Sequence, residues 1–429
     1  VIVSDKTGEL SSADISTASF ADAALGQAFA ALLSSKEAAF MVNGTGNSTE
    51  DYFVFNPSIY DTYYSYADII SRTWDMKNLA VEPKEGEGSF ESTSHDRASR
   101  YNEETGTYED WAANADGFGY VRIDAATGYR VMADLQGPGY LTHLWFAWDS
   151  TNPIKIYIDG ELVIDMPIVE FRRYFGEYDK LSFKANEMPD GYNGSNQLFV
   201  PIPYNESCVV MLDCGSQDMF YYYVGYYELE DGAAVEPFAF PLNEESKAAL
   251  AKANAELSDT SLPREDAGFH ENVPSGETVT LYDAAQPGAV NAWSLQLNIP
   301  ESELDEQATL TQWLLHIYWD GEETPAVAMT VADFFGTQYG LYRNVYDSAG
   351  PGVAEGGIMY SDWYMPYNTA KITLTNNSGT ARRVDACFEV ESLSTDEANA
   401  LMRFHANWQR SYQSEEERAP DAQFVYVEG

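Results

Sequence analysis

A short sequence pattern occurs twice in this chain and constrains its fold more than any other feature. The letters IYIDGE at 156–161 return as IYWDGE at 317–322. Three further patterns return in the same order, with all four offsets between 160 and 163 residues: YFG at 174–176 as FFG at 334–336, PYN at 203–205 as 366–368, and YYELE at 226–230 as CFEVE at 387–391. Single matches of this kind arise by chance, but four collinear ones indicate a duplicated domain.

The repeated unit has the pattern of β-strands. Short apolar runs are separated by turn residues, without the strand–helix alternation of a parallel sheet. Asp159-Gly160, between two alternating runs, predicts a hairpin with positive φ at the turn. We expect an all-β fold of two tandem, duplicated jelly-roll β-sandwiches with N-terminal and connecting helices. One strand is predicted to be buried on both sides, with alternate residues on opposite faces: Leu141, His143, Trp145 and Ala147 on one, and Thr142, Leu144, Phe146 and Trp148 on the other.

Segments outside the repeat have helical patterns. The Ala/Leu-rich run 19–40 and the run 66–80 predict packing helices, and 243–268 predicts a helix followed by a linker. Ser394 and Glu397 have the spacing of a capping box, which predicts a further helix. The predicted units are a helical segment at 1–80, a first jelly roll at 81–240, a helix and linker at 241–276, a second jelly roll at 277–393, and a C-terminal helix and strand at 394–429.

The charge balance excludes several partners. The chain has 68 acidic and 24 basic residues, a net charge of -44. Nucleic acid and anionic membrane surfaces are therefore not expected to bind, because phosphate binding needs clustered Lys and Arg. No stretch is long and apolar enough for a membrane span. The acidity and the start at Val1 rather than Met predict an extracellular or periplasmic location.

The sequence contains no familiar metal motif. The three cysteines lack zinc spacing, and the five histidines form no paired pattern, so we expect no cofactor. Asp110 and Asp116 in DWAANADGFGY (110–120) offer oxygen ligands for calcium, and a solvated turn is the other interpretation. The tyrosine-rich run 219–230 could stack sugar rings, although alternation along a strand would place half of these rings in the core.

Several runs in order resemble domain-of-unknown-function family 2961, which overlaps glycoside hydrolase family 172. These runs are STSHDRAS (92–99), LQGPGYLTHLWFAW (135–148), IYWDGEETPAVAMTVADFFG (317–336), WYMPYNTAKITLTN (363–376) and RFHANWQR (403–410). The resemblance implies tandem jelly rolls of viral-capsid type, assembly into trimers or higher homo-oligomers, and a carbohydrate partner. It also implies retaining cleavage of furanosides, such as α-fructofuranosides or α-D-arabinofuranosides, by two nearby carboxylates.

The catalytic motifs of the family are only partly matched. NGTGNSTEDYF at 43–53 is similar to the acid/base motif with two residues inserted, which places Glu50 at the acid/base position. No Trp-Trp-Gly-Glu-Gly-Asp run occurs, and KEGEGSF at 84–90 has only its Gly-Glu-Gly part, so the nucleophile is unknown. Family members continue beyond the equivalent of FVYVEG, which leads us to expect a fragment or a chain inactive alone.

Three functional hypotheses follow. The first is a furanoside-active glycoside hydrolase, whose site is completed by a further segment or by a neighbouring subunit. The second is a non-catalytic jelly-roll protein that builds an extracellular or capsid-like assembly. The third is a carbohydrate-binding subunit that uses the aromatic surface. Asp320 and Glu322 offer a carboxylate pair, but Asp159 and Glu161 repeat them in the first copy, which favours a turn-capping role.

Overall fold

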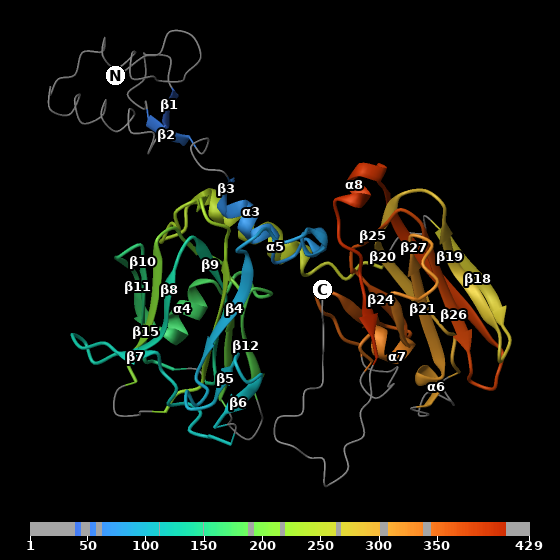
Figure 1. Cartoon of the computed structure of the whole chain (residues 1–429), viewed down its shortest axis with the longest axis horizontal. Coiled ribbons are helices and arrows are strands. Elements are labelled where there is room, and N and C mark those ends of the chain that lie inside the picture. Colours follow the sequence, from blue (N-terminus) through green and yellow to red (C-terminus); the bar gives the residue numbers. More distant parts are fainter. Residues whose placement is uncertain are drawn as a thin grey trace.

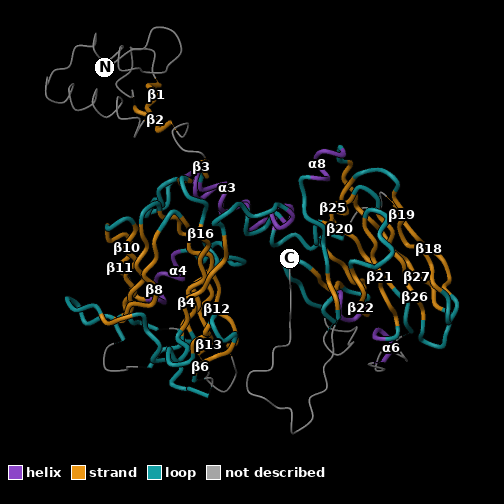
Figure 2. The backbone as a smooth tube through the Cα atoms, viewed as in Figure 1, coloured by secondary structure: helices purple, strands orange, loops and turns teal. Residues whose placement is uncertain are grey.

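The computed structural model describes residues 39–43, 52–56, 62–110, 112–148, 150–187, 193–214, 219–262, 267–300, 308–337 and 345–408. Within these ranges the chain forms two β-sandwiches that stand side by side and are joined by short helices (Figure 1). Strands dominate both halves (Figure 2). Each sandwich has its own hydrophobic core, and the two cores share no residue.

The first sandwich consists of two facing sheets. The β9 sheet has the order β12-β13-β9-β16-β4, with β14 also paired to β9, and the β10 sheet has the order β11-β10-β15-β8-β7. The β9 sheet comprises β4 (Gly88–Thr93), β9 (Gly139–Phe146), β12 (Ser182–Glu187), β13 (Asn193–Leu198), β14 (Ile202–Tyr204) and β16 (Tyr222–Glu228). The β10 sheet comprises β7 (Arg122–Ile123), β8 (Arg130–Gln136), β10 (Pro153–Ile158), β11 (Glu161–Pro167) and β15 (Ser207–Leu212). The helix α4 (Ile168–Tyr174) follows β11, and β5 (Arg100–Asn102) forms a hairpin with β6 (Thr107–Glu109).

The second sandwich repeats this arrangement. The β20 sheet has the order β18-β27-β20-β24-β23, with β25 paired to β20, and the β21 sheet has the order β19-β26-β21-β22-β28. The β20 sheet comprises β18 (Ala267–Val273), β20 (Gly288–Gln296), β23 (Pro351–Ala354), β24 (Ile358–Ser361), β25 (Met365–Tyr367) and β27 (Arg382–Ser392). The β21 sheet comprises β19 (Thr278–Ala284), β21 (Trp313–Trp319), β22 (Val327–Thr330), β26 (Ala370–Asn376) and β28 (Ala406–Asn407). Two short helices, α6 (Ala308–Thr311) and α7 (Val331–Phe334), flank β21 and β22.

Both copies have the strand order of a jelly roll, so the predicted fold class is confirmed. Strand for strand, β4-β16-β9-β13 in the first copy corresponds to β18-β27-β20-β24 in the second. In the other sheet, β8-β15-β10-β11 corresponds to β19-β26-β21-β22. Three of the four repeated sequence patterns occupy equivalent places. The fourth does not, because Tyr227 lies opposite Tyr140 while Glu391 lies opposite the equivalent Ala289. The patterns YYELE and CFEVE are therefore three residues out of register.

The repeated Asp-Gly pair stabilises the same corner in each copy. Asp159 and Asp320 have φ of 51° and 55°, as the hairpin prediction required. Oδ1 of Asp159 accepts hydrogen bonds from the backbone N–H groups of residues 205, 206 and 207, at 2.7–3.0 Å. Oδ1 of Asp320 accepts from Asn368 and Thr369 at 2.6 and 3.1 Å. The aspartate of each predicted pair therefore caps the loop that carries the repeated Pro-Tyr-Asn pattern rather than its own hairpin.

Strand β9 differs from its prediction because it contains a β-bulge. Gly225 lies opposite His143 and Tyr226 lies opposite Leu141, so Thr142 is an extra residue. The bulge brings Leu141 to the buried side with Leu144, while His143 stays half-buried on the outer side. The prediction from strict alternation, which places Leu141 on the same face as His143, is therefore wrong. Asn291 forms the equivalent bulge in β20.

Helices connect the two sandwiches. The predicted helix over 66–80 is two short helices, α3 (Tyr66–Ser71) and η2 (Met76–Ala80), separated where Asp75 takes an extended N-cap conformation. Helix α5 (Glu244–Glu256) packs against α3, and both contribute to the first core. The capping box of Ser394 and Glu397 is confirmed in α8 (Thr395–Asn399). Strand β18 begins inside the stretch predicted to be a linker.

At the N-terminal side, strands replace part of the predicted helical segment. Strand β1 (Ala39–Asn43) pairs with β2 (Tyr52–Asn56), and β3 (Thr62–Tyr64) runs parallel to β17 (Ala233–Val235). The rest of the predicted helix over 19–40 lies outside the described residues, as do Glu50 and the predicted last strand.

Candidate functional site

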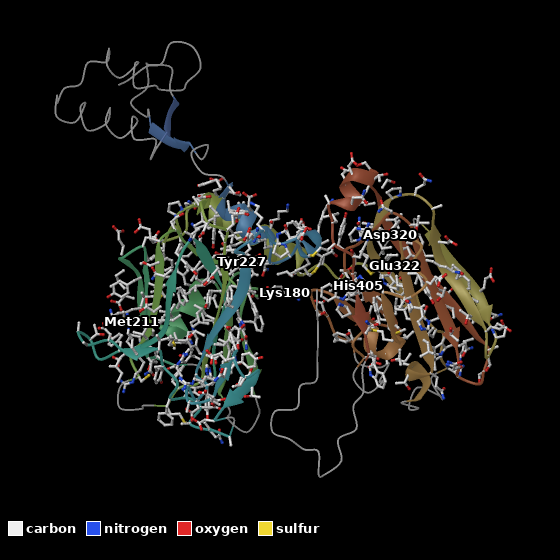
Figure 3. All side chains as sticks on the ribbon, viewed as in Figure 1. Lys180, Met211, Tyr227, Asp320, Glu322 and His405 are labelled. Atoms are coloured by element: carbon white, nitrogen blue, oxygen red, sulfur yellow. The ribbon has the colours of Figure 1, made fainter. Side chains whose placement is uncertain are left out.

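A cleft between the two sandwiches contains two adjoining cavities. The aromatic cavity, of about 850 Å³, lies against the β9 sheet, and the acidic cavity, of about 730 Å³, lies against the β20 sheet. Both are lined by Leu257 and by residues 347–349, so they meet at one place. Figure 3 shows Tyr227 and Lys180 on the side of the first sandwich that faces the second.

Contacts between the sandwiches hold the cleft in shape. Lys180 Nζ lies 3.3 Å from Asp347 Oδ2, and Lys77 Nζ lies 3.1 Å from Glu391 Oε1. The backbone N–H of Met402 also donates to the carbonyl of Ala80, at 2.7 Å. Because the ion pairs are partly exposed, their attraction is modest, and their main effect is to fix the relative position of the two walls.

The wall of the aromatic cavity presents aromatic rings and the guanidinium of Arg72. Tyr140 and Phe183 come from the β9 sheet, and Phe199 directly follows β13. Arg72 lies 4.9 Å from the centroid of Tyr64 and 5.3 Å from that of Tyr227. Its Nη1 donates to the Tyr140 hydroxyl at 3.3 Å. These contacts hold the guanidinium in the wall between aromatic faces.

A buried ion cluster behind this wall supports Arg72. Glu87, from the Gly-Glu-Gly run at 84–90, lies 4.0 Å from Arg72, and the Tyr64 hydroxyl lies 3.3 Å from both Glu87 and Glu230. Burial alone would raise the pKa of Glu230, but hydrogen bonds, first among them that from Lys84, lower it to about 2. Neither glutamate lines the cavity, so this pair has a supporting role.

The acidic cavity is lined by carboxylates from several segments. Asp259 follows α5, Asp347 precedes β23, Asp362 follows β24, and Glu389 and Glu391 lie on β27. The Tyr364 hydroxyl and the Lys77 ammonium both bond to Glu391, at 2.9 and 3.1 Å. The amide oxygen of Asn291, in the same wall, has no hydrogen-bond partner among the described residues. The wall therefore offers acceptors for the hydroxyl groups of a ligand.

The surroundings of Asp362 favour its protonated form. Burial, followed by the negative charges of Asp347, Asp259 and Glu389, raises the pKa of Asp362 to about 6. Asp347, in contrast, accepts a hydrogen bond from the Tyr360 hydroxyl at 2.7 Å and pairs with Lys180. A carboxyl with a raised pKa beside other carboxyl groups is an arrangement that acid/base catalysis uses.

The repeat explains where these acids come from. By strand pairing, Asp362 is equivalent to Phe199, Glu389 to Gly225, and Glu391 to Tyr227. Equivalent outward positions are thus apolar or aromatic in the first copy and acidic in the second. Sequence reasoning missed Asp362 because its approach to Asp347 and Asp259 depends on the fold, and no motif surrounds it.

The predicted site residues are not brought together. Glu50 lies outside the described residues. Asp116 is exposed and its Oδ1 accepts a hydrogen bond from the backbone of Asp96 at 2.8 Å, while Asp110 lies in a turn with φ of 48°. Within the described ranges no group of three or more acidic, His or Cys side chains could hold a metal ion, so the calcium prediction gains no support. Asp320 and Glu322 lie on the second sandwich (Figure 3) and line neither cavity of the cleft.

The fold and the cleft define a protein of two jelly rolls with a carboxylate-lined cavity between them. Two family models match the chain: the GH172 first beta-sandwich domain at residues 85–246, and the GH172 domain-like model at 265–387. Together they cover more than half of the chain, which therefore belongs to the GH172 family, as the resemblance predicted. A search of curated proteins gives no match.

Solved structures show only a distant likeness. The STIV MCP has 10% identity and a TM-score of 0.20, over 62% of this chain and 93% of its own. The major capsid protein P2 from Bacteriophage PM2 has 7% identity and a TM-score of 0.19, over 64% and 96%. A chain of the Sulfolobus Turreted Icosahedral Virus has 9% identity and a TM-score of 0.19, over 61% and 86%. At such scores the likeness carries no argument, and the jelly-roll assignment rests on the strand order. None of the described helices is long and apolar enough to cross a membrane.

Proposed function

We propose that this protein is a furanoside-active glycoside hydrolase whose chemistry takes place in the cleft, with Asp362 as the proton donor. The substrate class is an α-fructofuranoside or α-D-arabinofuranoside, cleaved with retention of configuration. Family membership supports the general class. The observation that carries the proposal is the cavity in which Asp362 lies beside other carboxylates.

The reaction needs a proton donor and a second carboxylate. Asp362 gives its proton to the glycosidic oxygen as the bond between this oxygen and the anomeric carbon breaks, and the bonding electrons leave with the oxygen. Asp347 or Glu389 attacks the anomeric carbon and forms an ester. Asp362 then takes a proton from water, whose oxygen displaces the ester carboxylate and restores both groups. Aromatic rings at the adjoining cavity pack against the apolar face of the sugar.

The test compares two candidate acids, Asp362 and Glu50. Purified Asp362→Asn and Glu50→Gln chains are assayed on alkyl and p-nitrophenyl α-furanosides. Asp362→Asn should lower kcat/KM on the alkyl glycosides by about 10²–10⁴-fold, because that leaving group needs its proton. The loss should be much smaller on p-nitrophenyl glycosides, whose leaving group is a good one.

The controls separate the roles. Glu103→Gln, at an exposed glutamate that lines neither cavity of the cleft, should leave the activity unchanged. A wild-type level of activity in Asp362→Asn, with a large loss in Glu50→Gln, would move the proton donor to Glu50, as the resemblance predicts. No release from any furanoside by the wild-type chain in its native oligomer would contradict the hydrolase proposal and favour a non-catalytic jelly-roll protein.

We further propose a homo-oligomer located outside the cytoplasm. Leu79, Val81 and Met402 are 60%, 51% and 41% exposed, and they lie close together because Val81 pairs with Leu401. Large apolar side chains at one exposed place are typical of a protein interface. Light scattering should give a trimer or a higher multiple, and Val81→Asp should shift it toward monomer. A wild-type monomer would contradict the assembly, and recovery of the native protein in the cytosolic fraction would contradict the location.

A further inference from the structure

A third cavity, which we call the side groove, lies on the outer face of the β9 sheet. It has a volume of about 530 Å³. One row of cross-strand neighbours forms its floor: Gln197 lies opposite Trp145, Trp145 opposite Tyr223, and Tyr223 opposite Thr93. Because they are cross-strand partners on neighbouring strands, Trp145 and Tyr223 present their side chains to the same outer face, and the Tyr223 ring centroid lies 5.2 Å from that of His143. Together they form an aromatic platform.

The side groove neighbours the aromatic cavity of the cleft. His143, in its wall, stacks on Phe199 with ring centroids 4.0 Å apart and an interplanar angle of 9°. Phe199 is itself part of the wall of the aromatic cavity. The stacked pair therefore lies between the two hollows, and a ligand longer than one sugar could cross it and contact both.

The polar groups of the side groove are hydrogen-bonding groups that suit sugar hydroxyls, and Asp116 is the one carboxylate among its described lining residues. His143 Nε2 lies 2.9 Å from Gln197 Oε1, and His95 Nδ1 lies 2.8 Å from Thr93 Oγ1. Burial lowers the pKa of His143, so its imidazole is neutral near pH 7. Among the described residues that line the groove there is no Lys or Arg. With a net charge of -44, the protein would repel an anionic glycan here.

The second copy shows that the fold does not require this platform. Strand pairing makes Ser294 equivalent to Trp145, Cys387 to Tyr223, and Ala292 to His143. The same jelly roll therefore forms with small residues at these outward positions. Half-buried aromatic rings on an outer sheet face need another explanation, and ligand binding supplies it.

We propose that the side groove is a sugar-binding subsite, and that the protein takes an uncharged oligosaccharide rather than a simple glycoside. The scissile furanoside lies in the cleft, and further residues of the same chain stack on Trp145 and Tyr223. This inference rests on the proposed function for the kind of sugar, but the binding itself does not require hydrolysis.

Calorimetric titration tests the subsite. The probes are linear α-linked arabinofuranose oligosaccharides and fructo-oligosaccharides, from monomer to hexamer, titrated into the Asp362→Asn chain so that turnover does not interfere. We expect affinity to increase with length. Trp145→Ala should weaken the binding of the longer oligosaccharides about tenfold, because it removes an aromatic ring on which a sugar stacks. Monosaccharide binding should not change.

Matched variants make the outcome decisive. Trp145→Phe keeps a stacking ring and should retain most of the affinity. Tyr101→Ala removes an exposed ring outside the groove, 49% exposed, and should have no effect. Affinity that does not depend on length, or a Trp145→Ala chain that binds like Tyr101→Ala, would overturn the subsite. Length-dependent binding that needs Trp145, together with no hydrolysis by the wild-type chain, would instead leave the subsite standing and remove the proposed function.

Discussion

The two jelly rolls share a strand order but differ in what their outer faces carry. On the β9 sheet, the outward positions are Phe199, Gly225 and Tyr227, and on the β20 sheet the equivalent positions are Asp362, Glu389 and Glu391. Inward positions stay apolar in both copies, because each sandwich must bury two sheet faces to be stable. Duplication thus preserved the core and left the outer faces free to acquire different chemistry.

The two cores also differ in the side chains that they bury. Substitutions at these core positions should have the largest effects on the free energy of unfolding. Leu144 and Trp293 are equivalent and both are buried, and Trp293 stacks on Phe388 with an angle of 3°. Trp293→Ala should cost about 3–5 kcal/mol of unfolding free energy, and Leu144→Ala about 2–5 kcal/mol. Because the cores share no residue, calorimetry should show each variant lowering a different transition. A single transition that moves in both variants would show that the two copies unfold together.

A second variant sharpens this test. The indole N–H of Trp293 has no hydrogen-bond partner among the described residues. Replacing an unsatisfied buried donor by an apolar ring is cheap, so Trp293→Phe should cost far less than the alanine variant. A loss as large as that of Trp293→Ala would mean that the indole makes a bond through water.

The turn aspartates give the next largest effect. Asp159→Ala and Asp320→Ala should each cost about 2 kcal/mol, because backbone N–H groups lose their acceptor and Ala is strained at positive φ. Asn at each position tolerates this φ and keeps one acceptor oxygen, so it should cost less. Urea unfolding measures both. An effect in only one copy would show that the shared pattern has lost its role in the other.

Asp320 adds a pH dependence that can be measured on the same variants. Burial would raise its pKa, but hydrogen bonds from Thr369 and Asn368 and from Arg403 lower it. A depressed carboxyl pKa stabilises the fold above the ordinary value of 3.8, and this contribution is lost as the pH falls through the lower folded value. The difference between wild type and Asp320→Ala should therefore shrink in strong acid.

Asp362 contributes a pH dependence of stability that is opposite in sign to that of Asp320 and smaller in size. Its folded pKa of about 6 exceeds the ordinary 3.8, so the folded state holds the extra proton between these values. Its contribution to stability is therefore greatest at low pH and declines as the pH rises to about 6. After allowance for solvent screening, the decline should be about 1 kcal/mol. Asp362→Asn should remove it in urea titrations at pH 4 to 7, and an unchanged pH profile would contradict the burial of this carboxyl.

The smallest effect concerns the contacts that join the copies. Lys77→Met removes the ion pair with Glu391. The Lys77 side chain is 43% exposed and the Glu391 side chain is 37% exposed. Exposed pairs of this kind contribute about 0–1 kcal/mol, so the unfolding midpoint should barely move and any change should vanish in high salt. A shift that persists in 1 M salt would indicate that Lys77 packs rather than pairs.

The sequence by itself determined the parts that depend on local pattern. The repeat, the Asp-Gly turns, helix α5 and the capping box of Ser394 could all be read because each depends on residues a few positions apart. Only the tertiary structure decided the faces and the site. A bulge at Thr142 changed which residues of β9 point outward. The strand register also showed that YYELE and CFEVE, which match in sequence, are three residues apart in structural position.

The acidic cavity shows the same division most clearly. Asp259, Asp347 and Asp362 are far apart in the sequence and belong to no shared motif, so nothing local predicts that they meet. Their approach follows from how two sandwiches and a connecting helix pack. The raised pKa of Asp362 follows in turn from the burial and the charges that this packing creates, because electrostatic interactions depend on distance in space and not along the chain.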